Sequence, residues 1–126
     1  MKVLEGLLYA KTHEWARREG GEVVVGISDH AQAELSDVVF IELPKTERAV
    51  KQDDPIAVIE SVKAAYDIYA PVSGKVSRVN SALEKDPALI NKDPYGEGWL
   101  FALKEVPEED FKKLMDKPAY EALLKG

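Results

Sequence analysis

The chain has 126 residues, 45% of them hydrophobic, with 17 basic and 23 acidic side chains and a net charge of −6. This length suits one compact domain, and the acidic balance without a Lys/Arg cluster argues against nucleic acid and anionic membranes as partners. No apolar run approaches the ~20 residues that a membrane-spanning helix needs. Cysteine is absent, which excludes disulfides, thiolate catalysis and cysteine-bound metals, so sulfur redox chemistry would require an attached group.

The N-terminal segment indicates a cellular location. Met1–Ala10 contains Glu5 and lacks the sustained apolar region of a secretory signal, and no Arg- and Ser-rich leader is present. We therefore expect a cytoplasmic protein, or the mature form of a mitochondrial matrix protein if the source is eukaryotic.

Short apolar or β-branched segments recur along most of the chain, separated by Gly, Pro, Asp and Asn. This pattern is typical of the short strands of a sandwich or flattened barrel. The predicted strands are residues 7–11, 14–18, 22–27, 38–43, 56–59, 66–70, 75–80, 89–91 and 99–103. Ser28 or Asp29 is suited to cap a short helix over residues 29–35, and residues 81–87 predict a polar connection.

The end of the chain predicts helices. Pro107 is suited to the first position of one helix, followed by the acidic residues 108–110, and Pro118 begins a second. Apolar stripes at helical spacing are formed by Phe111, Leu114 and Met115, and by Tyr120, Leu123 and Leu124. We expect these stripes to pack on the β-rich core.

The predicted elements form one domain over residues 1–126, with a core over about 1–105 and a helical tail over about 107–125. A faint sequence echo links residues 54–60 with residues 86–91. Internal two-fold symmetry and chance both remain open as its origin.

The stretch Ile56–Val76 contains two apolar arms, residues 56–59 and 66–70, on either side of Lys63. A single strand over both arms would exceed the usual ~3–10 residues, so we predict a hairpin with Lys63 at or near its tip. No Asn-Gly pair marks a two-residue turn there. On residue type alone, Lys63 is an ordinary solvated lysine.

Longer motifs favour a more specific interpretation, because they resemble the glycine cleavage system H-protein family and its lipoyl-attachment site. The motifs are Glu60-Ser61-Val62-Lys63-Ala64, Ala70-Pro71-Val72-Ser73-Gly74, Tyr9 with His13-Glu14-Trp15, Gly26-Ile27-Ser28-Asp29, and Pro-Tyr-Gly-x-Gly-Trp within residues 91–99. Lipoyl domains of 2-oxoacid dehydrogenase complexes lack the flanking motifs, and biotinyl domains place methionines where Val62 and Ala64 stand here. Tyr66 departs from the family pattern, in which a small residue is more common.

The resemblance implies a mainly β fold, the lipoyl/biotinyl barrel-sandwich hybrid of two small antiparallel sheets. It implies that Lys63 carries lipoic acid in amide linkage and that the attaching enzyme, a lipoate ligase or lipoyl transferase, recognises Glu60 and Gly74. It further implies a monomeric carrier rather than an enzyme. Such a carrier takes an aminomethyl group from the pyridoxal-phosphate-dependent glycine decarboxylase (P protein) to the tetrahydrofolate-dependent aminomethyltransferase (T protein), and dihydrolipoyl dehydrogenase (L protein) reoxidises it.

Four more residues resemble the family's cleft for the loaded arm: Thr12, Glu14, His30 and Asp67. The alternative is that Glu14 and Asp67 are ordinary solvated acids at strand ends. His13 and His30 do not predict a metal site, because the sequence lacks a third ligand and a His-Glu-x-x-His helix. No nucleophile-elbow motif indicates catalysis by the chain itself.

Three functions stand as hypotheses: a lipoylated carrier of glycine cleavage, an interaction or regulatory module that keeps the fold without turnover, and a carrier that passes lipoate to other acceptors. The presence of Lys63, Glu60 and Gly74 argues against an inert module. Glu14 and Asp67 favour glycine cleavage without excluding lipoate relay as an additional role.

Overall fold

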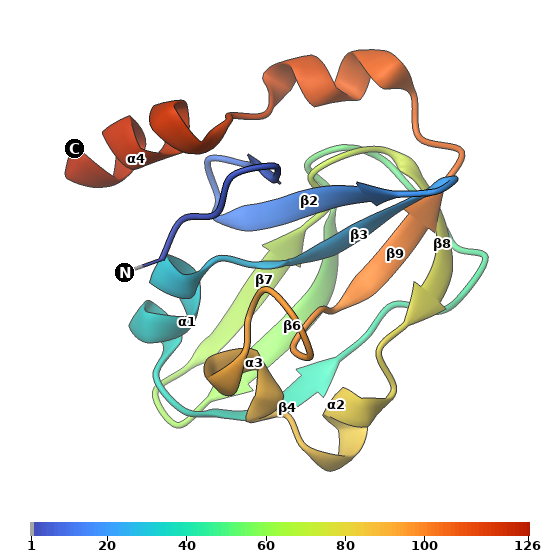
Figure 1. Ribbon diagram of the computed structural model, residues 1–126. Helices are drawn as coiled ribbons and strands as arrows, with labels where there is room; N and C mark the ends of the chain where they lie inside the picture. The colour runs from blue at the N-terminus through green and yellow to red at the C-terminus, as the bar shows by residue number, and fades with distance from the viewer. Residues whose placement is uncertain (1) are drawn as a thin grey trace.

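The computed structural model describes residues 2–126 and contains two antiparallel sheets with a shared core (Figure 1). The six-stranded sheet has the order β1 (Leu8–Tyr9), β2 (Glu14–Glu19), β3 (Glu22–Ile27), β9 (Phe101–Lys104), β8 (Gly74–Val79) and β5 (Ala49–Val50). The three-stranded sheet has the order β4 (Val38–Glu42), β6 (Pro55–Ser61) and β7 (Ala65–Tyr69). The helices are α1 (Asp29–Leu35), α2 (Ala82–Lys85), α3 (Leu89–Lys92), the 3₁₀ helix η1 (Glu108–Lys113) and α4 (Lys117–Lys125). The predicted mainly β fold with two antiparallel sheets is confirmed.

The main hydrophobic core lies between the two sheets. Ile59 of β6 and Ile68 of β7 enter it from the three-stranded sheet, and Val23 and Val25 of β3 enter it from the other. Val24 belongs instead to a second apolar cluster. Successive side chains of a strand point to opposite faces, so the run of three valines is explained by burial of β3 on both faces.

The second cluster joins the six-stranded sheet to the C-terminal tail. Tyr120 of α4 is fully buried, and its ring stacks on Tyr9 of β1 with centroids 4.3 Å apart. The backbone of Tyr9 also exchanges hydrogen bonds of 2.7 and 2.8 Å with that of Met115. Trp15 is buried in the same cluster, where Gly26 makes room for it: a Cβ at Gly26 would lie 2.5 Å from the Trp15 ring. The tail therefore packs on the sheet as expected, except that Leu123 of the predicted stripe is exposed.

One predicted strand is wrong: residues 89–91 begin the helix α3. Ile90 is fully buried, and the Asn91 side chain forms hydrogen bonds of 2.7 and 2.9 Å to the backbone on both sides of the α1–β4 connection. These tertiary contacts hold a short apolar segment in a helix, and residue type alone does not distinguish the two conformations. Residues 54–60 and 86–91 therefore differ in secondary structure, and the sequence echo between them has no structural counterpart.

Other boundaries also differ from the predictions. The polar connection over residues 81–87 contains α2, and the segment after Pro107 is a 3₁₀ helix rather than an α-helix. That helix ends at Lys113, so Leu114 and Met115 lie beyond it. The predicted helix over residues 29–35 is present as α1, and Ser28 caps it by accepting a hydrogen bond from a backbone N–H.

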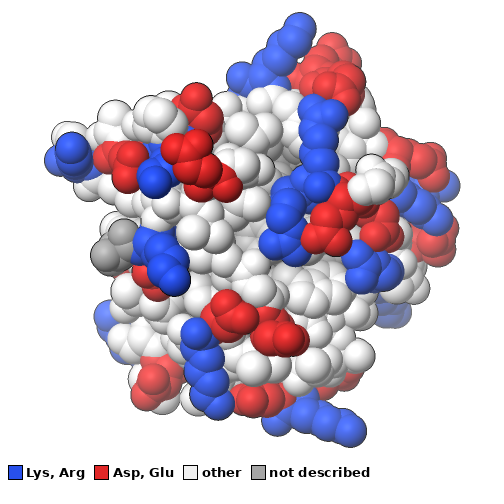
Figure 2. Space-filling model, in the orientation of Figure 1, with Lys and Arg blue, Asp and Glu red and all other residues white. Residues whose placement is uncertain are grey.

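The surface mixes charges of both signs. On the face shown in Figure 2, basic and acidic side chains are interspersed rather than gathered into separate areas. Large exposed hydrophobic side chains are few in the described part of the chain: Val39, Phe40, Val62 and Leu123. No helix within residues 2–126 is long and apolar enough to cross a membrane.

Candidate functional site

β6 and β7 form a hairpin with Lys63 at its tip. The last strand pair is Glu60 with Ala65. Ser61 closes the turn: its N–H donates to the Ala64 carbonyl at 2.9 Å, and its Oγ accepts from the N–H groups of Lys63 and Ala64 at 3.1 and 3.3 Å. A serine hydroxyl that binds the backbone two residues further on supports a turn without glycine. The predicted hairpin therefore forms without an Asn-Gly pair.

The Lys63 side chain is exposed and takes part in none of the ion pairs formed by residues 2–126. Its Nζ donates to the backbone carbonyl of Glu34 at 3.3 Å. Glu34 lies in the last turn of α1, where carbonyls lack partners within the helix and the helix dipole is negative. Acylation of Lys63 would thus break no salt bridge. A secondary amide keeps one N–H, which suits the same carbonyl, so the surroundings of Lys63 fit a lipoyl amide.

The two residues predicted to guide lipoate attachment lie in different sheets. Glu60 is exposed on β6, directly opposite Phe40 of β4. Gly74 begins β8 in the six-stranded sheet, with φ near 157°, and a Cβ there would lie 2.6 Å from the carbonyl oxygen of Lys104. The fold itself therefore requires glycine at position 74.

Glu14, at the start of β2, is a buried carboxylate with two hydrogen-bond donors. The Thr12 hydroxyl donates to Glu14 Oε1, and the backbone N–H of Tyr69 on β7 donates to Oε2 at 3.1 Å. The Glu14 side chain is only 1% exposed. The structure thus brings Thr12 and Glu14 together and excludes the alternative that Glu14 is an ordinary solvated acid.

Burial raises the pKa of Glu14 to about 7, with a small contribution from the nearby charge of Asp53 and against the opposing effect of the hydrogen-bond donors. Desolvation disfavours the charged form of a carboxyl group more than two neutral donors favour it. Protonated Glu14 is therefore populated near neutral pH, unlike an ordinary solvated glutamate. The Glu14 side chain can accept or release a proton when a charged group approaches.

His30 lies on α1, between the hairpin tip and the β1–β2 turn. Its Nε2 is 3.1 Å from Oε1 of Glu34, and its ring centroid is 4.7 Å from that of His13. His13 Nδ1 contacts the Tyr120 hydroxyl at 2.7 Å. The pKa of His13 is lowered, chiefly by burial and to a smaller extent by the charge of the neighbouring His30. Among residues 2–126, no three His, Asp or Glu side chains are grouped as a metal site.

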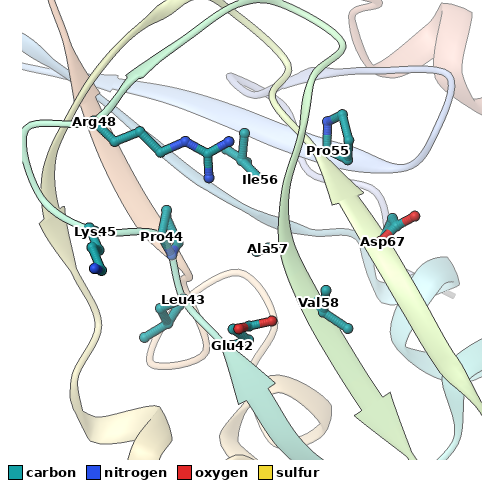
Figure 3. A pocket seen from close by; sticks show the side chains of 10 residues that line it. All are labelled: Glu42, Leu43, Pro44, Lys45, Arg48, Pro55, Ile56, Ala57, Val58 and Asp67. Carbon is teal, nitrogen blue, oxygen red and sulfur yellow. The ribbon is translucent and has the colours of Figure 1, made fainter.

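Asp67 points to the other side of β7 from the core. It is exposed and lines a groove of about 440 Å³ beside β6 and the segment that follows β4, where Arg48 extends toward Ile56 (Figure 3). None of the hydrogen bonds formed by residues 2–126 joins Asp67 to Glu14. Asp67 therefore makes no direct contact of this kind with the Thr12–Glu14 pair, although it lies on β7 two residues before Tyr69, the backbone donor to Glu14.

Sequence reasoning missed two parts of this region. Glu34 supplies a carbonyl to Lys63 and a carboxylate to His30, and its position four residues after His30 on a predicted helix was the available signal. Tyr120 contacts both His13 and Ser28 at 2.7 Å from more than ninety residues away in the chain. Only the fold reveals that contact.

A sandwich of a three-stranded and a six-stranded sheet that displays an exposed lysine at a hairpin tip has the architecture of a lipoyl-type carrier domain. The model of the family "Glycine cleavage H-protein" matches residues 7–126. The chain belongs to this family, a lipoyl-bearing carrier of the glycine cleavage system that is not an enzyme in itself.

Relatives of known name are similar to this chain along nearly its whole length. A glycine cleavage system H protein of Thermus thermophilus is 51% identical over 126 residues, covering 100% of this chain and 98% of the relative. One of Coxiella burnetii is 49% identical over 121 residues, covering 95% and 93%. The crystal structure of a glycine cleavage system H protein from Mycobacterium marinum matches with a TM-score of 0.87 and 33% identity, covering 98% of this chain and 100% of that one.

Proposed function

We propose that Lys63 carries lipoic acid through an amide bond and that the chain acts as the swinging-arm carrier of glycine cleavage. The observation that supports this function is the exposed amine at the hairpin tip, whose partner is a carbonyl rather than a carboxylate. Amide formation removes the positive charge of Lys63. The arm can then lie on apolar surface without burying an ammonium group.

The bound lipoyl group supplies a cyclic disulfide that accepts and releases an aminomethyl group. The chain tethers that group, which raises its effective concentration at each active site that it visits. The proposed partners are glycine decarboxylase (P protein), aminomethyltransferase (T protein), dihydrolipoyl dehydrogenase (L protein) and a lipoate ligase or lipoyl transferase. We propose the cytoplasm as the location.

Glu14 and Thr12 are proposed to hold the amine of the cargo. An ammonium group near Glu14 favours the ionised carboxylate and lowers its raised pKa, so binding and ionisation support each other. Burial of Glu14 also limits access of water to the cargo. Asp67 and His30 are proposed at the edge of the cleft, Asp67 from β7 and His30 from α1.

Glu60 and Gly74 are proposed to guide the attaching enzyme. Glu60 is exposed three residues before Lys63, so an enzyme bound at the tip can contact its carboxylate. Gly74 is also required by the contact between β8 and β9. Its part in attachment therefore has to be separated from its part in folding.

The test is intact-mass analysis of the chain incubated with lipoate ligase, lipoate and ATP. We expect one lipoyl increment, which Lys63→Arg abolishes while the variant keeps the wild-type circular dichroism spectrum. Lys75→Arg, at an exposed position on β8, is the matched control and should be modified like the wild type. An unmodified wild type, or an increment that persists in Lys63→Arg, would contradict the proposal.

A further inference from the structure

Three of the four large hydrophobic side chains that are most exposed among residues 2–126 lie near the lysine hairpin. Val39 and Phe40 of β4 are each 53% exposed, and Val62 of the tip is 65% exposed. Phe40 is the cross-strand partner of Glu60, and the Val62 N–H donates to the Asp37 carbonyl at 3.0 Å. We call Val39, Phe40 and Val62 the tip patch. Exposed apolar patches of this kind mark contact surfaces.

A β-bulge produces the exposure of β4. The register with β6 shifts between Val38 and Phe40, and Val38 and Ile41 are buried while both residues between them face outward. A regular strand would alternate between the two faces, so it could not expose two neighbouring apolar side chains in this way. Bulges commonly re-aim side chains next to functional sites.

The tip patch continues into a groove along the outer edge of β4. β4 is an edge strand of its sheet, and α2 forms the opposite wall. The groove has a volume of about 660 Å³, and its apolar lining includes Val39, Phe40, Leu43 and Leu83. An apolar projection of a partner could therefore be buried there beside the patch.

Exposed acidic side chains surround the patch and the groove. Asp37 and Glu60 flank the tip patch, and Glu42 and Glu84 lie at the groove, where Lys85 is the basic neighbour. Lys63, the proposed site of lipoylation, adds a positive charge at the tip. A complementary surface would have an apolar centre and a rim of Lys and Arg, as electrostatically matched interfaces do.

We propose that the tip patch and the groove beside it form the docking surface for the enzyme that attaches lipoate to Lys63. This inference rests on the proposed function and extends the recognition of Glu60 across the strand pair to Phe40. The attaching enzyme has to hold the tip so that the Lys63 amine reaches its active site. The apolar residues next to that lysine provide contact area, and the acidic rim orients the encounter.

The test measures lipoylation rates at varied concentrations of the chain, with purified lipoate ligase, lipoate and ATP. Phe40→Ser should raise the KM for the chain about tenfold and leave kcat within about twofold, because an interface anchor contributes to binding rather than to chemistry. Phe40→Tyr keeps the ring and should restore the wild-type KM. Leu123→Ser, at the exposed apolar position of α4, is the matched control and should match the wild type.

A second measurement tests the charged rim. The kcat/KM of the wild type should fall as salt is added, and Glu42→Lys should both lower kcat/KM and flatten its salt dependence. Equal KM values for Phe40→Ser, Leu123→Ser and the wild type would overturn the docking surface while leaving lipoylation of Lys63 intact. A wild type that is not modified at all would instead overturn the proposed function. A wild type that sediments as a dimer, and dissociates in Phe40→Ser, would assign the surface to a second copy of the chain.

Discussion

A single buried carboxyl group, that of Glu14, couples the proposed cargo site to the stability of the fold. Its donors come from the Thr12 hydroxyl and the Tyr69 backbone, so β2 and β7 meet at this side chain. The buried position that excludes water from a cargo amine also makes the charged form unfavourable when no cation is present. The ionised Glu14 carboxylate therefore lowers the stability of the fold near neutral pH when no cargo amine is bound.

This cost predicts a pH dependence of stability. The pKa of Glu14 is about 7 in the folded chain against 4.5 for an ordinary glutamate, so the folded state binds the proton more tightly. This tighter proton binding stabilises the folded state fully below pH 4.5, and the stabilisation is lost as the pH rises through 7. It corresponds to about 3 kcal/mol of unfolding free energy. Glu14→Gln keeps a neutral donor and acceptor and should remove this dependence.

Urea unfolding of both proteins from about pH 4 to pH 8 measures this difference directly. The unfolding free energy of Glu14→Gln minus that of the wild type should increase by about 3 kcal/mol across this range. Glu121→Gln, at an exposed position of α4, controls for the loss of a surface charge. Parallel curves for Glu14→Gln and the wild type would show that the carboxyl group is not desolvated.

At the scale of elements, strand length and apolar arms were sufficient to predict the lysine hairpin. The turn itself was not predictable from glycine or Asn-Gly, because Ser61 closes it with its side chain. Residues 89–91 are helical because the Asn91 side chain is hydrogen-bonded to the α1–β4 connection and Ile90 is buried in the core. Local pattern thus predicted most strands, including β9, whose partner β3 is distant in sequence, and it failed at residues 89–91, where tertiary contacts override a short apolar segment.

The same limit applies to the candidate site. The family resemblance indicates Glu14, Thr12 and Lys63, but the burial of Glu14 depends on β7 covering it and has no signal in the sequence near residue 14. Asp67 lies two residues before Tyr69, whose backbone N–H donates to Glu14. The side chain of Asp67 itself is exposed on the face of the three-stranded sheet that is turned away from the core. Its exposure therefore depends on how β7 packs, which the motif around Lys63 does not specify.

The contact of β8 with β9 predicts that Gly74 serves the fold. Gly74→Ala would place a Cβ 2.6 Å from the Lys104 carbonyl oxygen, and backbone atoms cannot move aside as a flexible side chain does. We expect a loss of about 1–3 kcal/mol of unfolding free energy, measured by urea titration. Gly21→Ala is the control, since no atom lies within 4 Å of the corresponding Cβ. Wild-type stability of Gly74→Ala, combined with slow lipoylation, would instead assign Gly74 to enzyme recognition alone.

Across the whole molecule, polar contacts extend from the tail to the lysine. The Tyr120 hydroxyl of α4 contacts His13 and the α1 cap Ser28, and the other end of α1 presents the Glu34 carbonyl to Lys63. The position of α1 relative to the hairpin is therefore set partly by a residue at the end of the chain. We propose that residues 107–125 are not an appendage but part of one cooperative domain.

This proposal predicts that removing the Tyr120 ring destabilises the whole chain. Tyr120→Ala would leave a cavity against Tyr9 and remove the partner of His13 and Ser28, at a cost of about 3–5 kcal/mol of unfolding free energy. Leu123→Ala, at an exposed position on the same helix, should change the unfolding free energy by less than about 0.5 kcal/mol. Hydrogen exchange supplies the sharper test, because a cooperative domain loses amide protection in β2 and β3 as well as in α4. Faster exchange confined to α4, with unchanged protection in the sheets, would mean that the tail unfolds separately.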